Sequence, residues 1–231
     1  DSDAGTADLI RELGLAASGT DFESDLQYIS IIGSIEGHIA LPMENKTTKY
    51  EHLIPQLIAV EENPKLRGLL VILNTMGGDV EAGLALAEMI ATLSKPTVSL
   101  VMGGGHSIGI PLATATDYSF IAGTATMTLH PIRTTGLVIT AETTFDYMRK
   151  TQDRVIDFIA GHSRATRKRV TELMNCSDNM SNDVGTILFG KEAVDAGIID
   201  AVGGVSQALG ELRRRVAKVD ELEKEISIST D

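Results

Sequence analysis

The chain has 231 residues, of which 43% are hydrophobic, and this is enough apolar material for one domain with a sizeable core. Its formal net charge of -12 argues against a nucleic-acid partner, because proteins that bind phosphate backbones need clustered lysine and arginine. The single cysteine, Cys176, excludes an intrachain disulfide and a zinc cluster, and it fits a reducing, cytoplasmic location. No apolar run approaches the about 20 residues of a transmembrane helix, so we expect no membrane span.

The first half of the chain predicts strands and helices in alternation. Residues 1–25 are polar and rich in small side chains, which predicts a mobile N-terminal arm. A short strand is expected over residues 28–33 and a loop over 36–49. An amphipathic helix follows over Tyr50–Glu62, and the Asn-Pro pair after it ends this helix.

Two strand–glycine turn–helix modules come next. In the first, the apolar run Leu69–Leu73 leads into Asn74-Thr-Met-Gly-Gly-Asp79, and apolar residues then recur at helical spacing to Ile90. In the second, the run Val98–Met102 leads into Gly-Gly-Gly-His-Ser-Ile-Gly109 and an apolar, helix-like run. If neighbouring parallel strands carry the two turns, both turns open at the same edge of the sheet.

The remaining elements are strands over 118–121 and 125–129, a mostly helical segment over 141–174, a helix and short strand over 188–200, a helix over 205–216 and a charged tail over 217–231. The helical segment 141–174 carries an apolar stripe of Phe145, Met148, Val155, Ile156 and Phe158, and it is long enough to project from the domain. We expect this stripe either to join subunits or to pack on its own sheet.

Ser107 is the candidate nucleophile. Gly105-His-Ser-Ile-Gly109 fits the G-x-S-x-G pattern, in which a sharp turn exposes the serine between a strand and a helix. The alternative is a glycine turn that only packs a helix onto a sheet; a dinucleotide site is disfavoured because Ile108 stands where its last glycine is needed. The amides of Gly78 and Ile108 would converge on one oxygen, as in an oxyanion hole.

A serine nucleophile needs a base within hydrogen-bond reach. The chain has five histidines: His38, His52, His106, His130 and His162. His106 is adjacent to the serine, so its side chain is expected to point elsewhere. His38, His52 and His162 lie in polar or charged stretches. His130 ends an apolar strand and precedes Pro131, which favours it as the base.

The acid that orients the base is less defined by the sequence. Aspartates on the long helices are expected to be solvated. Asp183 lies in the loop Ser181-Asn-Asp-Val-Gly185, where a bend can bring it back to the sheet edge. Spacing alone leaves Asp183 and Asp178 as alternatives.

Four motifs in order resemble the ClpP family of serine peptidases. They are Asn74-Thr-Met-Gly-Gly78, Gly105-His-Ser-Ile-Gly109, Thr128-Leu-His-Pro131 and Glu192-Ala-Val-Asp-Ala-Gly-Ile-Ile-Asp200. The order Ser, His, Asp also matches that family, whereas α/β-hydrolases run Ser, Asp, His. More narrowly, segments within 33–38, 45–52 and 77–83 resemble the translocation-enhancing protein branch of the family.

The resemblance implies an α/β, crotonase-like fold of repeated strand-strand-helix units with a projecting handle helix, over residues 26–216. It also implies a homo-oligomeric ring and proteolysis in an enclosed chamber, with no cofactor and no metal. It makes Ser107 the nucleophile, His130 the base and Asp183 the orienting acid, with Gly78 and Ile108 as oxyanion donors.

The site departs from the family pattern at two places. The position of the family's acid corresponds to Gly185, so that Asp183 requires a two-residue insertion after it. Pro131 follows His130 directly where the family usually has glutamine, and residues 132–136 lack the family's glycine-rich, substrate-pairing strand.

The surface departs as well. ClpP docks its unfoldase through aromatic side chains, and the roughly corresponding residues here are Leu70, Ile72 and Leu93. A Clp-type ATPase partner is therefore unsupported.

The sequence thus predicts a self-assembling serine endopeptidase that cuts small or unfolded polypeptides, with a link to protein translocation. Two alternatives stand beside it. One is a non-catalytic ClpP-like scaffold or secretion-assisting protein that has kept its site residues. The other, less favoured, is a crotonase-type acyl-CoA enzyme, which shares a two-amide oxyanion hole but has no serine nucleophile.

Overall fold

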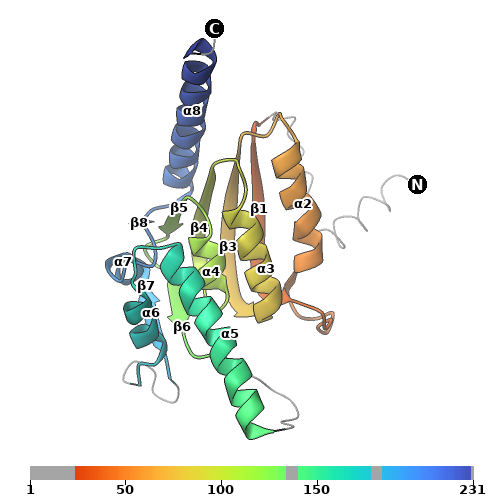
Figure 1. Ribbon diagram of the computed structural model, residues 1–231, viewed down its shortest axis with the longest axis vertical. Coiled ribbons are helices and arrows are strands. Elements are labelled where there is room, and N and C mark those ends of the chain that lie inside the picture. Colours follow the sequence, from red (N-terminus) through yellow and green to blue (C-terminus); the bar gives the residue numbers. More distant parts are fainter. Residues whose placement is uncertain (1–23, 134–139, 178–183, 230–231) are drawn as a thin grey trace, which may run out of the picture.

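One sheet organises the part of the chain that the structure describes. The computed structural model describes residues 24–133, 140–177 and 184–229, the last three of these by backbone alone. Within these residues eight strands lie in the order β2-β1-β3-β4-β5-β8, and β6 pairs with both β4 and β7 (Figure 1). All pairs are parallel except β6 with β7. Together with seven described helices they confirm the predicted α/β class.

The elements have the following bounds. The strands are β1 (Leu26–Glu36), β2 (Thr47–Lys49), β3 (Gly68–Gly78), β4 (Thr97–Gly105), β5 (Tyr118–Ile121), β6 (Thr126–Leu129), β7 (Thr186–Phe189) and β8 (Ala201–Val202). The helices are α2 (Tyr50–Glu62), α3 (Val80–Ala91), α4 (Gly109–Thr114), α5 (Ala141–Gly161), α6 (Arg167–Met174), α7 (Gly190–Asp195) and α8 (Val205–Ser229).

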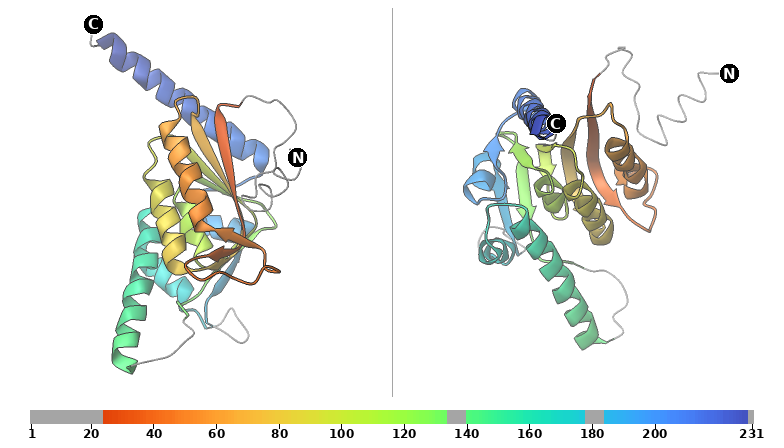
Figure 2. Two further views of the ribbon diagram at one scale, coloured as in Figure 1. Left: turned by 90° about the vertical axis from the view of Figure 1, so that its right-hand side faces the viewer. Right: turned by 45° about the horizontal axis from the view of Figure 1, so that its top comes forward.

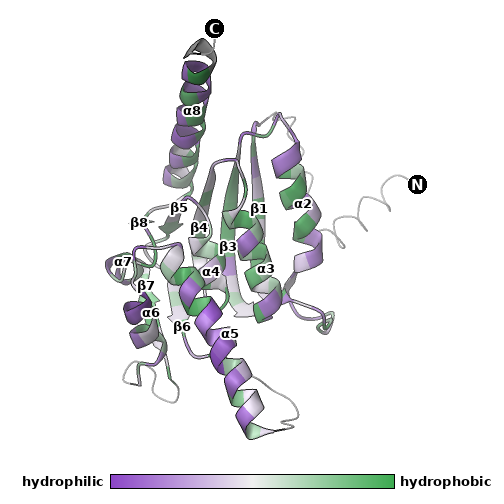
Figure 3. Ribbon diagram, viewed as in Figure 1, coloured by the Kyte–Doolittle hydropathy of each residue, from purple (hydrophilic) through white to green (hydrophobic). Residues whose placement is uncertain are grey.

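Helices cover both faces of the sheet, because the central strands are apolar on both sides. On β3, Leu69, Val71 and Leu73 face the main core, which α2, α3 and α4 close from one side. Leu70 faces the other way, into a smaller core that α8 closes with Ala208, Leu212 and Val216. Figure 3 shows the strands and the covering helices largely in hydrophobic colours where they meet.

The predicted elements agree with the structure where hydrophobic periodicity is strong. The predicted helix over Tyr50–Glu62 and the strand over Tyr118–Ile121 have the observed bounds, and the two glycine modules are β3–α3 and β4–α4. The prediction missed β2 and β7. Both are short strands whose pairing partners define them: β2 pairs with the end of β1, and β7 pairs with β6.

Two predicted segments need a further remark. The predicted N-terminal arm lies almost wholly outside the described residues, which begin at residue 24. The predicted charged tail over 217–231 is mostly helical, because α8 continues to Ser229 and projects beyond the sheet (Figure 2). None of the described helices is long and apolar enough to cross a membrane.

The apolar stripe of α5 divides into two parts. Val155, Ile156 and Phe158 are buried in the main core of the subunit. Phe145 is 67% exposed on the first half of the helix, which projects from the domain and is mostly hydrophilic (Figures 1 and 3). The two expectations for this stripe therefore apply to different halves: the second half packs on its own domain, and the first half is left uncovered within the subunit.

Candidate active site

Ser107 lies on a strained turn between β4 and α4. Its φ of 54° is positive, and it is the one such non-glycine residue in the described part of the chain. Hydrogen bonds fix the turn on both sides: the Ser107 amide donates to Thr128 O at 2.9 Å, and the His106 amide donates to Thr75 O at 3.1 Å. A strained serine that neighbouring strands hold in place is the geometry of a nucleophile elbow.

The first glycine turn touches the second, as the parallel pairing of β3 and β4 requires. A Cβ atom added at Gly77 would lie 2.7 Å from Ser107 Cβ and 3.3 Å from Ser107 Oγ. Gly77 also has a φ of 90°, which side chains other than hydrogen rarely tolerate. Its amide donates to the buried Thr75 hydroxyl at 3.1 Å. The end of β3 therefore has glycine at position 77, because the nucleophile lies against it.

A cavity of about 240 Å³ joins the candidate residues. Ser107, His130, Gly78 and Ile108 all line it. The rest of its wall is mostly apolar and consists of Met76, Val80, Ile110, Leu129, Ile132, Arg133, Val155, Ile159 and Met174. The structure thus brings together four of the five residues that the sequence singled out, next to apolar side chains from α5 and α6 that the sequence analysis had not assigned to the site.

Gly78 and Ile108 line this cavity from the two glycine-rich segments. Among the described residues the Ile108 amide donates to no protein acceptor. On the other turn, the amides that flank Gly78 are engaged: the Gly77 amide with Thr75, and the Asp79 amide with Ile35 O at 2.9 Å. Asp79 also caps α3 through Ala82 N at 2.8 Å, which fixes the turn. Gly78 and Ile108 thus line the same cavity as Ser107, and their amides are the candidate donors of an oxyanion hole.

The imidazole of His130 is held by its own main chain. His130 Nδ1 lies 2.7 Å from Pro131 O. A carbonyl oxygen can only accept a hydrogen bond, so Nδ1 carries the proton, and in the neutral ring the lone pair is on Nε2. This is the tautomer that a general base needs. No hydrogen bond joins His130 to Ser107 within the described residues; such bonds often form only in the substrate complex.

Three of the other four histidines have structural partners. His106 Nδ1 bonds to Thr128 Oγ1 at 2.9 Å, outside the cavity. Burial, and second the positive charge of protonated His130, lower the pKa of His106 below its ordinary value. His162 donates to Phe158 O at 2.8 Å and stacks on that ring. His38 meets the Tyr50 hydroxyl at 3.4 Å.

The candidates for the orienting acid lie outside the part of the chain that the structure describes. Asp183 and its alternative Asp178 both lie outside the described residues. Gly185, which the resemblance aligned with the family's acid, is described and lies against His130. A Cβ atom at Gly185 would lie 2.3 Å from Leu129 O and 3.0 Å from His130 Cβ. No side chain fits at this position unless the backbone moves.

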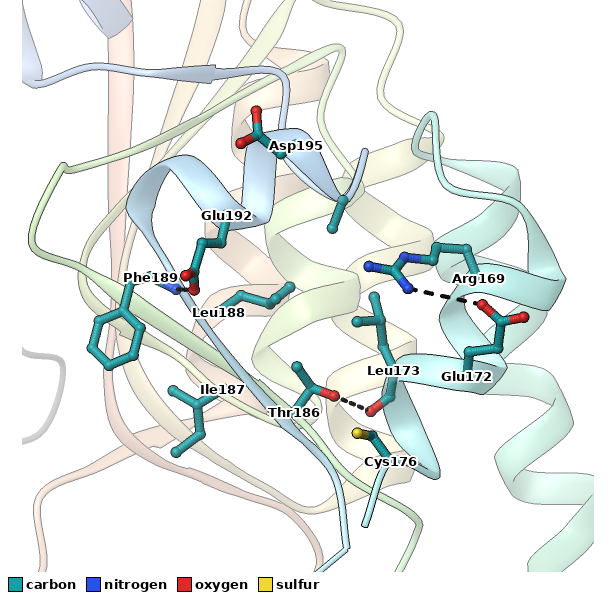
Figure 4. Close-up of a pocket in the computed structure, with 11 residues that line it drawn as sticks. Arg169, Glu172, Leu173, Cys176, Thr186, Ile187, Leu188, Phe189, Glu192 and Asp195 are labelled. Atoms are coloured by element: carbon teal, nitrogen blue, oxygen red, sulfur yellow. Dashed lines mark hydrogen bonds and ion pairs between the residues drawn. The ribbon is translucent and has the colours of Figure 1, made fainter. Parts of the chain in front are cut away.

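A larger cavity of about 710 Å³ lies between α6 and the β7–α7 segment (Figure 4). Its charged side chains have neighbours: Arg169 pairs with Glu172 at 3.8 Å, and Glu192 accepts from the Phe189 amide at 3.0 Å. The Thr186 hydroxyl donates to Leu173 O at 2.6 Å across its floor. None of the four candidate residues around Ser107 lines it, and its contacts hold β7 in place.

Comparison with known proteins places the whole site within one family match. Residues 24–206 match the family model described as Clp protease. The chain is 53% identical over 215 residues to translocation-enhancing protein TepA of Halalkalibacterium halodurans, which covers 93% of this chain and 84% of that protein. It is 25% identical over 162 residues to the ATP-dependent Clp protease proteolytic subunit of Streptococcus uberis, and this alignment covers 65% of this chain and 76% of that subunit.

Proposed function

The chain belongs to the Clp protease family, and on that premise we propose that it is a serine endopeptidase that hydrolyses peptide bonds of small or unfolded polypeptides. The observation that carries the proposal is the convergence of Ser107, His130, Gly78 and Ile108 on one cavity. The strained turn at Ser107 supports it, because strain of this kind is retained at functional sites.

In the first half of the reaction, His130 Nε2 accepts the hydroxyl proton of Ser107 while Ser107 Oγ attacks the scissile carbonyl carbon. The carbonyl oxygen becomes negatively charged and receives hydrogen bonds from the amides of Gly78 and Ile108. One such donor is worth roughly 3–4 kcal/mol in the transition state. The imidazolium then protonates the leaving amine, which leaves an acyl-enzyme on Ser107.

In the second half, water takes the place of the amine. His130 accepts a proton from water as the water oxygen attacks the acyl carbon, and the same two amides stabilise the second oxyanion. The bond between the acyl carbon and Ser107 Oγ then breaks, His130 returns its proton to Ser107 Oγ, and the new carboxyl end of the peptide leaves. The apolar wall formed by Ile110, Val155 and Ile159 supports a preference for an apolar side chain next to the scissile bond.

The third catalytic role is still a prediction from the sequence. We propose Asp183 as the acid whose charge stabilises the imidazolium, with Asp178 as its alternative. Asp183→Asn is expected to lower turnover, and Asp178→Asn is expected to leave turnover nearly unchanged. The reverse pattern would transfer the role to Asp178.

Self-assembly is part of the proposal. Members of the Clp protease family form oligomeric rings, and the uncovered first half of α5, with Phe145 and Tyr147 more than half exposed, is a surface that a second subunit can cover. The proposal includes no Clp-type ATPase partner. Leu70, at one of the positions of the family's docking aromatics, is only 3% exposed because α8 packs over it.

A second candidate function follows from the name of the 53% identical relative, which refers to translocation and not to proteolysis. A translocation partner that keeps its site residues without using them would explain the absence of a carboxylate at Gly185. The two functions are compatible in one protein, and catalysis is the part that experiment separates.

The test is hydrolysis of unfolded protein and peptide substrates by the wild type and by two variants. Ser107→Ala and His130→Ala are each expected to lower turnover on the order of 10⁶-fold, because nucleophile and base act as a unit. Both variants are expected to keep the circular dichroism spectrum and the particle size of the wild type. A wild type without hydrolysis on any substrate, or a variant as active as the wild type, would contradict the assignment.

A further inference from the structure

We propose that Gln152 of α5 is a positioning residue for catalysis, which acts on His130 through the Pro131–Ile132 peptide. The inference rests on the proposed peptidase function and assigns a task to a residue that does not line the cavity. It links the helix that projects from the domain to the tautomer of the catalytic base.

The link consists of two hydrogen bonds on one peptide group. On one side of this group, the carbonyl of Pro131 accepts from His130 Nδ1 at 2.7 Å. On the other side, the amide of Ile132 donates to Gln152 Oε1 at 3.1 Å. A peptide group is planar, with its C=O and N–H pointing in opposite directions. Gln152 therefore fixes the direction in which the Pro131 carbonyl points, and the carbonyl fixes the imidazole.

Among the described residues, the Pro131 carbonyl is the one group with a hydrogen bond to the imidazole of His130. Gly185 lies against its Cβ and offers no side chain. Pro131 has no amide hydrogen and a fixed φ, so the chain after His130 has few conformations available. The carbonyl of Pro131 thus keeps the proton on Nδ1, while the charge of Asp183 would add to the stability of the imidazolium.

Gln152 is itself well anchored. It lies half-buried on α5, next to the buried Thr151, whose hydroxyl donates to Tyr147 O at 3.0 Å. Two residues further on, Arg154 makes a double ion pair with Glu81 of α3, at 2.7 and 3.1 Å. The helix turn that carries Gln152 is therefore held on the domain by both packing and charge.

The experiment compares three single variants of the full chain. Gln152→Met keeps the length of the side chain but removes the acceptor, and Gln152→Glu keeps an acceptor oxygen. Lys65→Met, at an exposed position between α2 and β3, is the control. We expect Gln152→Met to lower kcat about tenfold with little change in KM, because it removes one hydrogen bond that orients the base. Gln152→Glu is expected to restore most of kcat, and Lys65→Met is expected to match the wild type.

A spectroscopic signature separates positioning from a merely structural effect. In ¹⁵N-labelled protein at alkaline pH, the imidazole nitrogens of His130 are expected to show the proton on Nδ1. Gln152→Met is expected to mix the two tautomers, and Gln152→Glu to restore one. A wild type with the proton on Nε2, or a Gln152→Met variant with unchanged kcat and tautomer, would overturn the inference.

Failure of the inference is distinguishable from failure of the proposed function. A wild type that hydrolyses peptides while Gln152→Met behaves like Lys65→Met overturns only the role of Gln152. A wild type whose Ser107 has no activity overturns the peptidase proposal, and the inference with it. The tautomer of wild-type His130 is measurable even if Gln152→Met does not fold.

Discussion

At the scale of the residue, the contact between Gly77 and Ser107 determines how the candidate nucleophile is placed. The conformation of Gly77 at the end of β3 and that of Ser107 after β4 depend on each other, since their nearest atoms leave no room for a methyl group. A change at Gly77 therefore acts on the nucleophile directly, although Gly77 has no side chain of its own.

Gly77→Ala is expected to reduce the reactivity of Ser107 by at least about 100-fold, because a displacement of about 1 Å at a reacting group has an effect of that size. The measurement is the rate of labelling by a fluorophosphonate, alongside the free energy of unfolding. Gly210→Ala on α8 is the control, since its Cβ meets nothing within 4 Å. This control should label at the wild-type rate and raise the free energy of unfolding by about 0.5–1 kcal/mol. Equal labelling of Gly77→Ala and the control would contradict the site geometry.

The lowered pKa of His106 predicts a pH dependence of stability. Burial, followed by the charge of His130, lowers the pKa of His106 from 6.5 in the folded state, so the unfolded state binds more protons just below that pH. The contribution is complete above pH 6.5 and is lost as the pH falls through the folded-state pKa. The lowered pKa values of Glu61, Glu81 and Glu211 act in a separate window below 4.5, where protonation removes their contribution.

Urea unfolding of the wild type and of His106→Asn, measured from pH 8 down to pH 5, tests this expectation. The free energy of unfolding of the wild type should fall below pH 6.5, and that of the variant should fall less steeply. Two parallel curves would show that His106 does not titrate differently in the folded and unfolded states.

The residues of the site differ in how far the sequence could predict them. Ser107, Gly78 and Ile108 were predictable because positive φ and close approach leave a glycine pattern in the sequence. The roles of Pro131 O and Gln152 were not, because a main-chain carbonyl and a long-range side-chain acceptor have no residue type of their own. Gly185 was singled out through the resemblance, but its contact with His130 required the structure.

At the scale of the element, α5 serves two environments along its length. Its second half supplies Val155 and Ile159 to the cavity wall. Its first half leaves Phe145 exposed. Periodicity predicted the stripe correctly but not the division, because the same spacing of apolar residues fits a core and an interface equally well. Likewise, β7 has four residues, too few for alternation to distinguish it from the start of α7.

The exposed half of α5 is expected to join subunits. The double variant Phe145→Glu and Met148→Glu should give smaller, folded particles in sedimentation and lower peptidase activity, because charges oppose burial of this surface. Ile39→Glu with Met43→Glu adds the same charge on exposed residues of the β1–β2 loop and is the control. A wild type that sediments as a monomer would contradict the role of α5, and so would a variant of unchanged size.

At the scale of the whole molecule, the sheet brings distant segments of the chain to one edge. Parallel pairing of β1, β3 and β4 places the two glycine turns together, and the pairing of β6 with β4 brings His130 to the same place. The strand order was not readable from the sequence alone, since it depends on long-range pairing. The resemblance carried by the four motifs did predict that Ser107, His130, Gly78 and Ile108 lie close together.

The most direct test of the account is the mass of the intact protein and of its peptides after treatment with a fluorophosphonate. The account predicts that one adduct per chain forms in the wild type, that the adduct lies on Ser107, and that Ser107→Ala and His130→Ala remain unlabelled while folded. An unlabelled wild type, or an adduct on a residue other than Ser107, would contradict it.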